Sequence, residues 1–154
     1  MKRVELAVVA LPASPSLKDV LPDAKATRVV AGVLFPATNG EPFSDFAYVD
    51  TGAPMSVVPQ RIWQNCSVEI TAEHEVKGLA LPTTRGIPAY VGRIGFSLLD
   101  NGRAVVHLRP LVYLARSNSV PLLLGIHEVL ARFRLEVDFP RRTACLLEPN
   151  PASG

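Results

Sequence analysis

The sequence predicts an all-β protein, and three observations support this. Apolar and β-branched residues occur in runs of strand length, as in 27–35, 43–49 and 120–124. Asn39-Gly40 and Asp100-Asn101-Gly102 separate such runs, and Asn and Gly tolerate the positive φ that tight hairpin turns require. Fourteen prolines in 154 residues disfavour long helices. Because 48% of the residues are apolar, we expect a globular domain with its own core rather than disorder.

Composition divides the chain into three segments. We expect residues 1–26 to form an N-terminal strand and a Pro-rich arm, since residues 12–26 are rich in Pro, Ser and Ala. Residues 27–148 are expected to form the compact domain, and the Pro, Gly and Ser of residues 149–154 predict a flexible tail.

Within the domain, each expected element follows from its pattern of residues. Pro59 suits the first turn of a short helix, and a cluster without apolar side chains at 82–86 predicts the polar tip of a projecting hairpin. The expected order is strands 27–35, 43–49 and 55–58, a helix at 60–65, strands 68–80, 87–91, 93–99, 103–114 and 120–124, a short C-terminal helix at 127–133, and a hairpin of strands 135–139 and 143–147.

One ionisable turn lies between two apolar runs. Asp50-Thr51-Gly52-Ala53-Pro54 follows the apolar strand 46–49 and precedes the apolar run 55–58. Placing a carboxylate among apolar residues costs free energy unless it is paired or hydrogen-bonded, so its position here favours a functional role. The triplet combines a carboxylate, a hydroxyl and an unobstructed backbone, which together can hold and activate a water molecule. Only one such triplet occurs in the chain.

The order of motifs extends this observation. After the Asp-Thr-Gly-Ala turn come a hairpin with a polar tip, then Leu122-Leu123-Leu124-Gly125 about seventy residues on, a short helix and a final hairpin. This series resembles the retropepsin-like aspartic proteases, the single-domain relatives of pepsin found in retroviruses and bacteria. The resemblance covers roughly residues 27–147 and implies the acid-protease fold, a closed barrel or folded sheet with one short C-terminal helix.

The resemblance implies a role for each matching residue. Asp50 would activate the water, Thr51 would brace the active site through hydrogen bonds to another subunit, and Gly52 would let the substrate backbone approach. Ala53 completes the turn, and Leu123, Leu124 and Gly125 would pack beneath it. The hairpin 76–91 would be a flap that closes over an extended substrate. Its substrate-binding residues would be Leu79, Ala80, Leu81, Pro82, Thr83, Thr84, Arg85 and Gly86.

A single catalytic carboxylate predicts a homodimer. Peptide hydrolysis by this route needs one group that accepts a proton from water and another that donates a proton to the carbonyl oxygen. Two carboxylates in contact share one proton and so supply both functions, as is established for aspartic proteases in general. Asp50 must therefore meet Asp50 of a second copy across a two-fold axis. We expect an aspartic endopeptidase that cleaves polypeptides and needs no cofactor or metal.

Two other interpretations remain open. Retroviral members often carry an acidic residue at Pro54 that pairs with an Arg at Ile126, and many relatives carry Asp or Asn at His127. These departures allow a non-catalytic dimeric module that binds peptide with the same fold. The other alternative is an unrelated β-barrel with a chance Asp-Thr-Gly turn.

The remaining features predict few other partners. The net charge is only +2 and the basic residues are scattered, so we expect no nucleic-acid partner. No apolar run is long enough to cross a bilayer, and Glu5 interrupts the apolar residues near the N-terminus, so we expect no membrane partner and a soluble, cytoplasmic protein. Cys66 and Cys145 are expected to be buried free thiols, and no spacing typical of a zinc site occurs.

Overall fold

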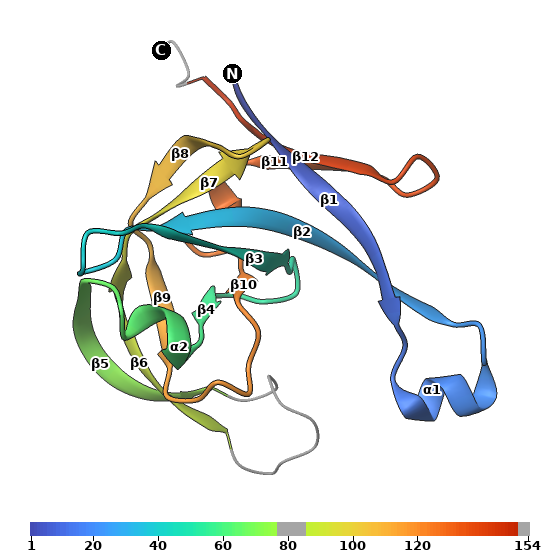
Figure 1. Ribbon diagram of the computed structural model, residues 1–154, viewed down its shortest axis with the longest axis horizontal. Helices are drawn as coiled ribbons and strands as arrows, with labels where there is room; N and C mark the ends of the chain where they lie inside the picture. The colour runs from blue at the N-terminus through green and yellow to red at the C-terminus, as the bar shows by residue number, and fades with distance from the viewer. Residues whose placement is uncertain (77–85, 151–154) are drawn as a thin grey trace.

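The computed structural model describes residues 1–76 and 86–150, and it is mostly β-sheet (Figure 1). The all-β prediction is confirmed. The strands are β1 (Lys2–Pro12), β2 (Lys25–Phe35), β3 (Phe43–Val49), β4 (Val57–Val58), β5 (Val68–Val76), β6 (Ile87–Ile94), β7 (Phe96–Asp100), β8 (Arg103–Leu108), β9 (Leu111–Ala115), β10 (Leu123–Leu124), β11 (Arg134–Asp138) and β12 (Thr143–Glu148). The helices are α1 (Pro15–Val20) and α2 (Gln60–Trp63), with a 3-10 turn at Leu130–Arg132.

The strands form one folded sheet that does not close. Their order is β11-β12-β1-β2-β3-β10-β4-β9-β6-β5, and β7 pairs with β2 and with β8. Val30 of β2 lies opposite both Ala7 of β1 and Tyr48 of β3, whereas Gly32 lies opposite Leu99 of β7 and Phe46 of β3. Thus β1 and β7 occupy successive stretches of one edge of β2. The sheet branches there and has β11, β5 and β8 as its ends, so of the expected closed barrel or folded sheet the closed barrel is wrong.

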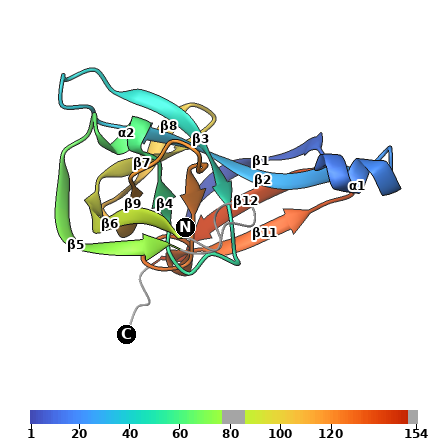
Figure 2. The same ribbon diagram turned by 90° about the horizontal axis from the view of Figure 1, so that it is seen from below.

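Residues 1–29 form β1, the helix α1 and the first part of β2. β1 lies between β12 and β2, and its outer part, residues 8–12, pairs with residues 25–29 of β2. α1 connects these strands; Pro15 occupies its first turn, and the Ser14 hydroxyl accepts a 3.4 Å hydrogen bond from the amide of Leu17. The resulting two-stranded ribbon with its helix projects from the body of the protein (Figures 1 and 2).

The core lies on one face of β2 and is completed by the later strands. Ala31, Val33 and Phe35 alternate along β2 and are fully buried. Phe35 contacts the rings of Phe43 and Phe96. Cys66 and Cys145 are buried and free, as the sequence predicts. This packing joins the end of β2 to the start of β3, since Phe35 lies opposite Phe43.

Turn chemistry was predicted well, but the C-terminal helix was not. Asn101 and Gly102 both have positive φ, 48° and 81°, and join β7 to β8 as a tight hairpin. The helix expected at 127–133 is reduced to the 3-10 turn at Leu130–Arg132. The reason is Glu128, whose φ of 56° is incompatible with a right-handed helix.

Only the base of the hairpin that was predicted to be a flap lies within the described residues. β5 and β6 pair in antiparallel fashion from Val68 opposite Ile94 to Val76 opposite Ile87. The predicted tip residues 79–85 lie outside the described residues, and Gly86 is partly exposed just before β6. Across residues 1–76 and 86–150, no helix has the length and apolar character needed to span a membrane.

Candidate functional site

Asp50 is positioned by the end of β3. The last two residues of β3, Tyr48 and Val49, pair in parallel with Leu123 and Leu124 of β10. The amide of Asp50 then donates a 3.0 Å hydrogen bond to the carbonyl of Leu124. Because β10 also pairs with β4, it joins the strand before the Asp50 turn to the strand after it. The backbone therefore fixes where Asp50 leaves the sheet.

The turn leaves the Asp50 carboxylate open to a ligand. The amide of Gly52 donates to Asp50 Oδ1 at 2.9 Å, and the amide of Ala53 donates to the Asp50 carbonyl at 3.2 Å. Asp50 is half-buried, whereas Thr51 and Gly52 are exposed. Within the described residues, Asp50 Oδ2 and the Thr51 hydroxyl have no hydrogen-bond partner. One carboxylate oxygen is thus oriented by the backbone and the other can accept a proton.

Gly125 supports this turn through a very close backbone approach. A Cβ at Gly125 would lie 2.5 Å from the Met55 carbonyl oxygen and 2.8 Å from that of Ala53. The amide of Gly125 donates a 2.9 Å hydrogen bond to the Ser56 hydroxyl, and the Ser56 carbonyl accepts from the amide of Tyr113. Ser56 is only 1% exposed. Its side chain is therefore a buried connection between the Asp50 turn and β10.

Replacing Ser56 by Ala tests this connection. The change leaves the buried Gly125 amide without a partner, and we expect the free energy of unfolding to fall by about 1–3 kcal/mol. Urea unfolding would measure it. Ser44→Ala is the control, since Ser44 is exposed on β3 and should change stability by less than about 0.5 kcal/mol. Equal losses in the two variants would contradict a structural role for the Ser56 hydroxyl.

Backbone hydrogen bonds join the two loops where no side-chain ion pair can form. The amide of Ile126 donates to the carbonyl of Ala53 and the amide of His127 donates to that of Pro54, both at 2.9 Å. Pro54 takes part through its carbonyl oxygen, so its lack of an amide hydrogen does not prevent either bond. These backbone hydrogen bonds connect the loops 50–56 and 125–128 as one unit, although Pro54, Ile126 and His127 differ from the residues usual in the retropepsin-like family.

Glu128 clamps this unit to the neighbouring strands. Its carboxylate accepts hydrogen bonds from Arg93 at 2.8 and 3.4 Å and from the amide of Leu111 at 2.8 Å. Two hydrogen bonds lower the pKa of Glu128 from 4.5 to about 2, and the bond from Arg93 contributes more than the bond from Leu111. Sequence reasoning missed this residue, because nothing in the spacing of Arg93 and Glu128 indicates that they meet.

The lowered pKa gives a pH-dependent prediction. A carboxylate with a depressed pKa in the folded state stabilises the protein above its unfolded pKa of 4.5, and this stabilisation is lost as pH falls toward about 2. We expect Glu128→Gln to be less stable than the wild type at pH 6, with the difference shrinking progressively between pH 4.5 and 2.5. Urea unfolding across this range would measure it, and a difference that stays constant with pH would contradict the clamp.

The structure brings together only part of the predicted site. Asp50, Thr51, Gly52 and Ala53 lie against Leu123, Leu124 and Gly125, but the flap residues Leu79 to Arg85 lie outside the described part. In that described part, no hydrogen bond or ion pair joins Asp50 to another acidic side chain. Nor does any group of three His, Cys, Asp or Glu residues there form a metal site.

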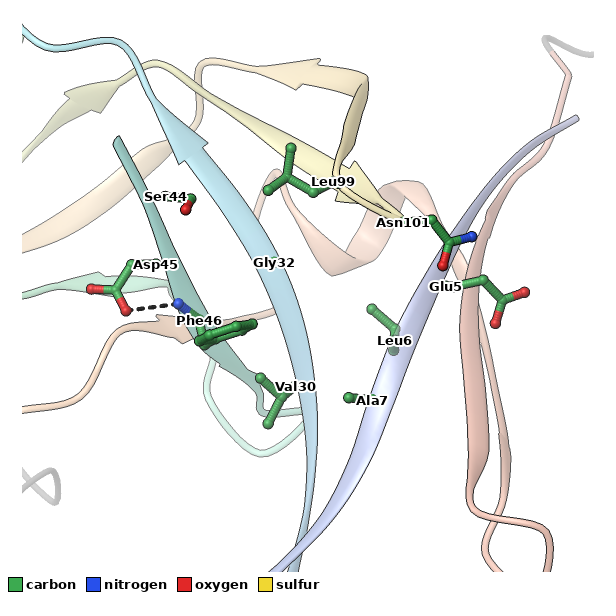
Figure 3. Close-up of a pocket in the computed structure, with 11 residues that line it drawn as sticks. Glu5, Leu6, Ala7, Val30, Gly32, Ser44, Asp45, Phe46, Leu99 and Asn101 are labelled. Atoms are coloured by element: carbon green, nitrogen blue, oxygen red, sulfur yellow. Dashed lines mark hydrogen bonds between the residues drawn. The ribbon is translucent and has the colours of Figure 1, made fainter. Parts of the chain in front are cut away.

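A separate hollow of about 450 Å³ lies on the outer face of the sheet (Figure 3). Gly32 forms part of its lining, and Phe46 and Leu99 lie opposite Gly32 on the adjacent strands. The carboxylates at its margin are engaged, since Asp45 pairs with Arg61, and Glu5 pairs with Arg3. The hollow contains none of the predicted site residues.

Comparison of the chain with protein-family models finds no match, and comparison with curated proteins finds none either. The function must therefore be argued from the Asp50 turn and its supports.

Proposed function

We propose that this protein is a retropepsin-like aspartic endopeptidase whose active site forms between two copies of the chain. One observation carries the proposal: a strand end and a buried backbone brace hold Asp50 in a surface turn with one carboxylate oxygen free. The close approach of Gly125 to the carbonyl groups of Ala53 and Met55 limits how far the Asp50 turn can shift, which supports the fixed geometry that catalysis needs.

The chemistry needs two such carboxylates sharing one proton. The ionised Asp50 takes a proton from water while the water oxygen bonds to the peptide carbonyl carbon. The protonated Asp50 of the other copy gives its proton to the carbonyl oxygen, forming a tetrahedral intermediate. When the C–N bond breaks, the leaving nitrogen takes the proton from the first carboxyl group and the second recovers its own.

The exposed residues of the turn suit contact with a second copy. Thr51 is exposed with an unpartnered hydroxyl among the described residues, and Ile126, which is hydrogen-bonded to the turn, is also exposed. One Asp50 per chain requires an isologous dimer with the site on its axis. An extended polypeptide would lie between the Asp50 pair and the β5–β6 hairpins of the two copies.

Cleavage of a peptide library by the purified protein tests the proposal. The assay should cover pH 4 to 7, with pepstatin as inhibitor and Asp50→Ala as the inactive control. Cleavage that both treatments abolish supports the protease. Peptide binding without cleavage at any pH would identify a non-catalytic binding module. A protein that remains monomeric and inactive would identify an unrelated β-fold with a chance turn.

A further inference from the structure

The projecting ribbon, here called the arm (residues 8–29), has an open strand edge. Residues 8–12 of β1 pair with residues 25–29 of β2, and α1 lies at the tip. β3 pairs with β2 only from Val30 onward. The edge of residues 25–29 opposite β1 therefore has no strand partner in the described part of the chain.

The tip of the arm exposes apolar side chains. α1 buries none of its residues, and Leu17, Val20 and the adjoining Leu21 are 43%, 76% and 56% exposed. An isolated two-stranded ribbon is only marginally stable in water. Clustered exposed apolar residues at the end of such a ribbon favour a contact with another molecule.

The direction of the arm favours a second copy of the chain as that molecule. β2 and β3 are antiparallel, and Val30 lies opposite Tyr48, two residues before Asp50. The arm thus begins beside Asp50 and continues past it in the direction in which β3 runs (Figure 1). Because Val30 lies opposite Tyr48, residue 28 lies level with Asp50, and the β2 residues 25–27 extend about 10 Å beyond Asp50, at about 3.3 Å per residue. A second copy whose Asp50 meets this one would lie beyond the turn, within reach of the arm.

We propose that the arm crosses to a second copy of the chain and that Leu17, Val20 and Leu21 pack against it. This inference rests on the proposed function, because the Asp50 pair places the second copy. By symmetry the partner's arm makes the same contact, so each dimer contains two copies of the contact. The arm is then a dimerisation element, and the apolar residues of α1 are its anchor.

A double variant at the tip, Val20→Asp with Leu21→Asp, tests the contact. Both side chains are more than half exposed, so the monomer should keep its fold, which circular dichroism would verify. We expect the dimer dissociation constant from sedimentation equilibrium to rise at least about tenfold. Ile70→Asp is the matched control, because Ile70 is 48% exposed and its strand, β5, lies away from the arm (Figure 1). The dimer dissociation constant of this variant should equal that of the wild type.

The outcomes separate this proposal from the protease. An active dimer that the tip variant does not weaken overturns the arm contact and leaves the Asp50 pair standing. A dimer that the tip variant weakens, but that never cleaves peptide, supports the arm contact and overturns the protease. A wild type that stays monomeric at high concentration overturns both. Hydrogen exchange gives an independent readout, since the amides of residues 16–29 should become more protected at concentrations where the dimer forms than in the monomer.

Discussion

Asp50→Asn is expected to reduce kcat/KM for peptide cleavage by at least about 10³-fold, because the amide cannot exchange the proton that the reaction requires. The loss should be in catalysis rather than in folding. The Asn side-chain oxygen can still accept the hydrogen bond from the Gly52 amide, the one side-chain hydrogen bond of Asp50 in the described residues. We therefore expect the free energy of unfolding to change by less than about 1 kcal/mol.

A matched control lies on the same strand. Asp45 is a partly exposed carboxylate of β3 that pairs with Arg61, and Asp45→Asn should keep its activity within a few-fold of the wild type. Initial rates with one fluorogenic peptide, measured for both variants beside urea unfolding, would complete the comparison. Similar activities for the Asp50 and Asp45 variants would contradict a catalytic role for Asp50.

Among the variants proposed here, Gly125→Ala should cause the largest fall in the free energy of unfolding, about 3 kcal/mol. The added Cβ would collide with backbone rather than with a movable side chain. The atoms it meets are the carbonyl oxygens of Ala53 and Met55, which belong to the Asp50 turn. Either the turn or β10 must move, and both changes displace the carboxylate. We therefore expect activity to fall further than the loss of folded protein accounts for.

Gly95→Ala controls for the general effect of replacing glycine. A Cβ at Gly95 would have as its nearest neighbour the Leu108 carbonyl oxygen at 3.9 Å, an ordinary contact. Its stability should stay within about 1 kcal/mol of the wild type in urea unfolding. If the two alanine variants lose the same stability, the close approach at Gly125 does not constrain the turn.

Local patterns predicted the centre of the site. The apolar run ending at Asp50 forms β3, and Leu123-Leu124 forms the strand beside it, because short apolar runs next to turn residues identify buried strands. The Asn101-Gly102 turn was predictable for the same reason, since positive φ favours those residue types. Function assigned to these residues remains a proposal that the variants above test.

Long-range pairings were not predictable. Glu128 and Arg93 are 35 residues apart in the sequence and come into contact only in the folded chain. The positive φ of Glu128 replaces the start of an expected helix with a turn. The branching of the sheet depends on β2 changing partner between Val30 and Gly32, which no local pattern indicates. Residues 12–26 were expected to form a Pro-rich arm without a helix, yet Ser14 and Pro15 there begin α1.

A crystal structure of the assembly that forms in solution would test the central claim most directly, through the distance between the Asp50 carboxyl groups of two chains. We predict that they lie within hydrogen-bond distance, about 3 Å apart, on a two-fold axis. Two copies whose Asp50 side chains are far apart, each facing solvent, would contradict the shared active site.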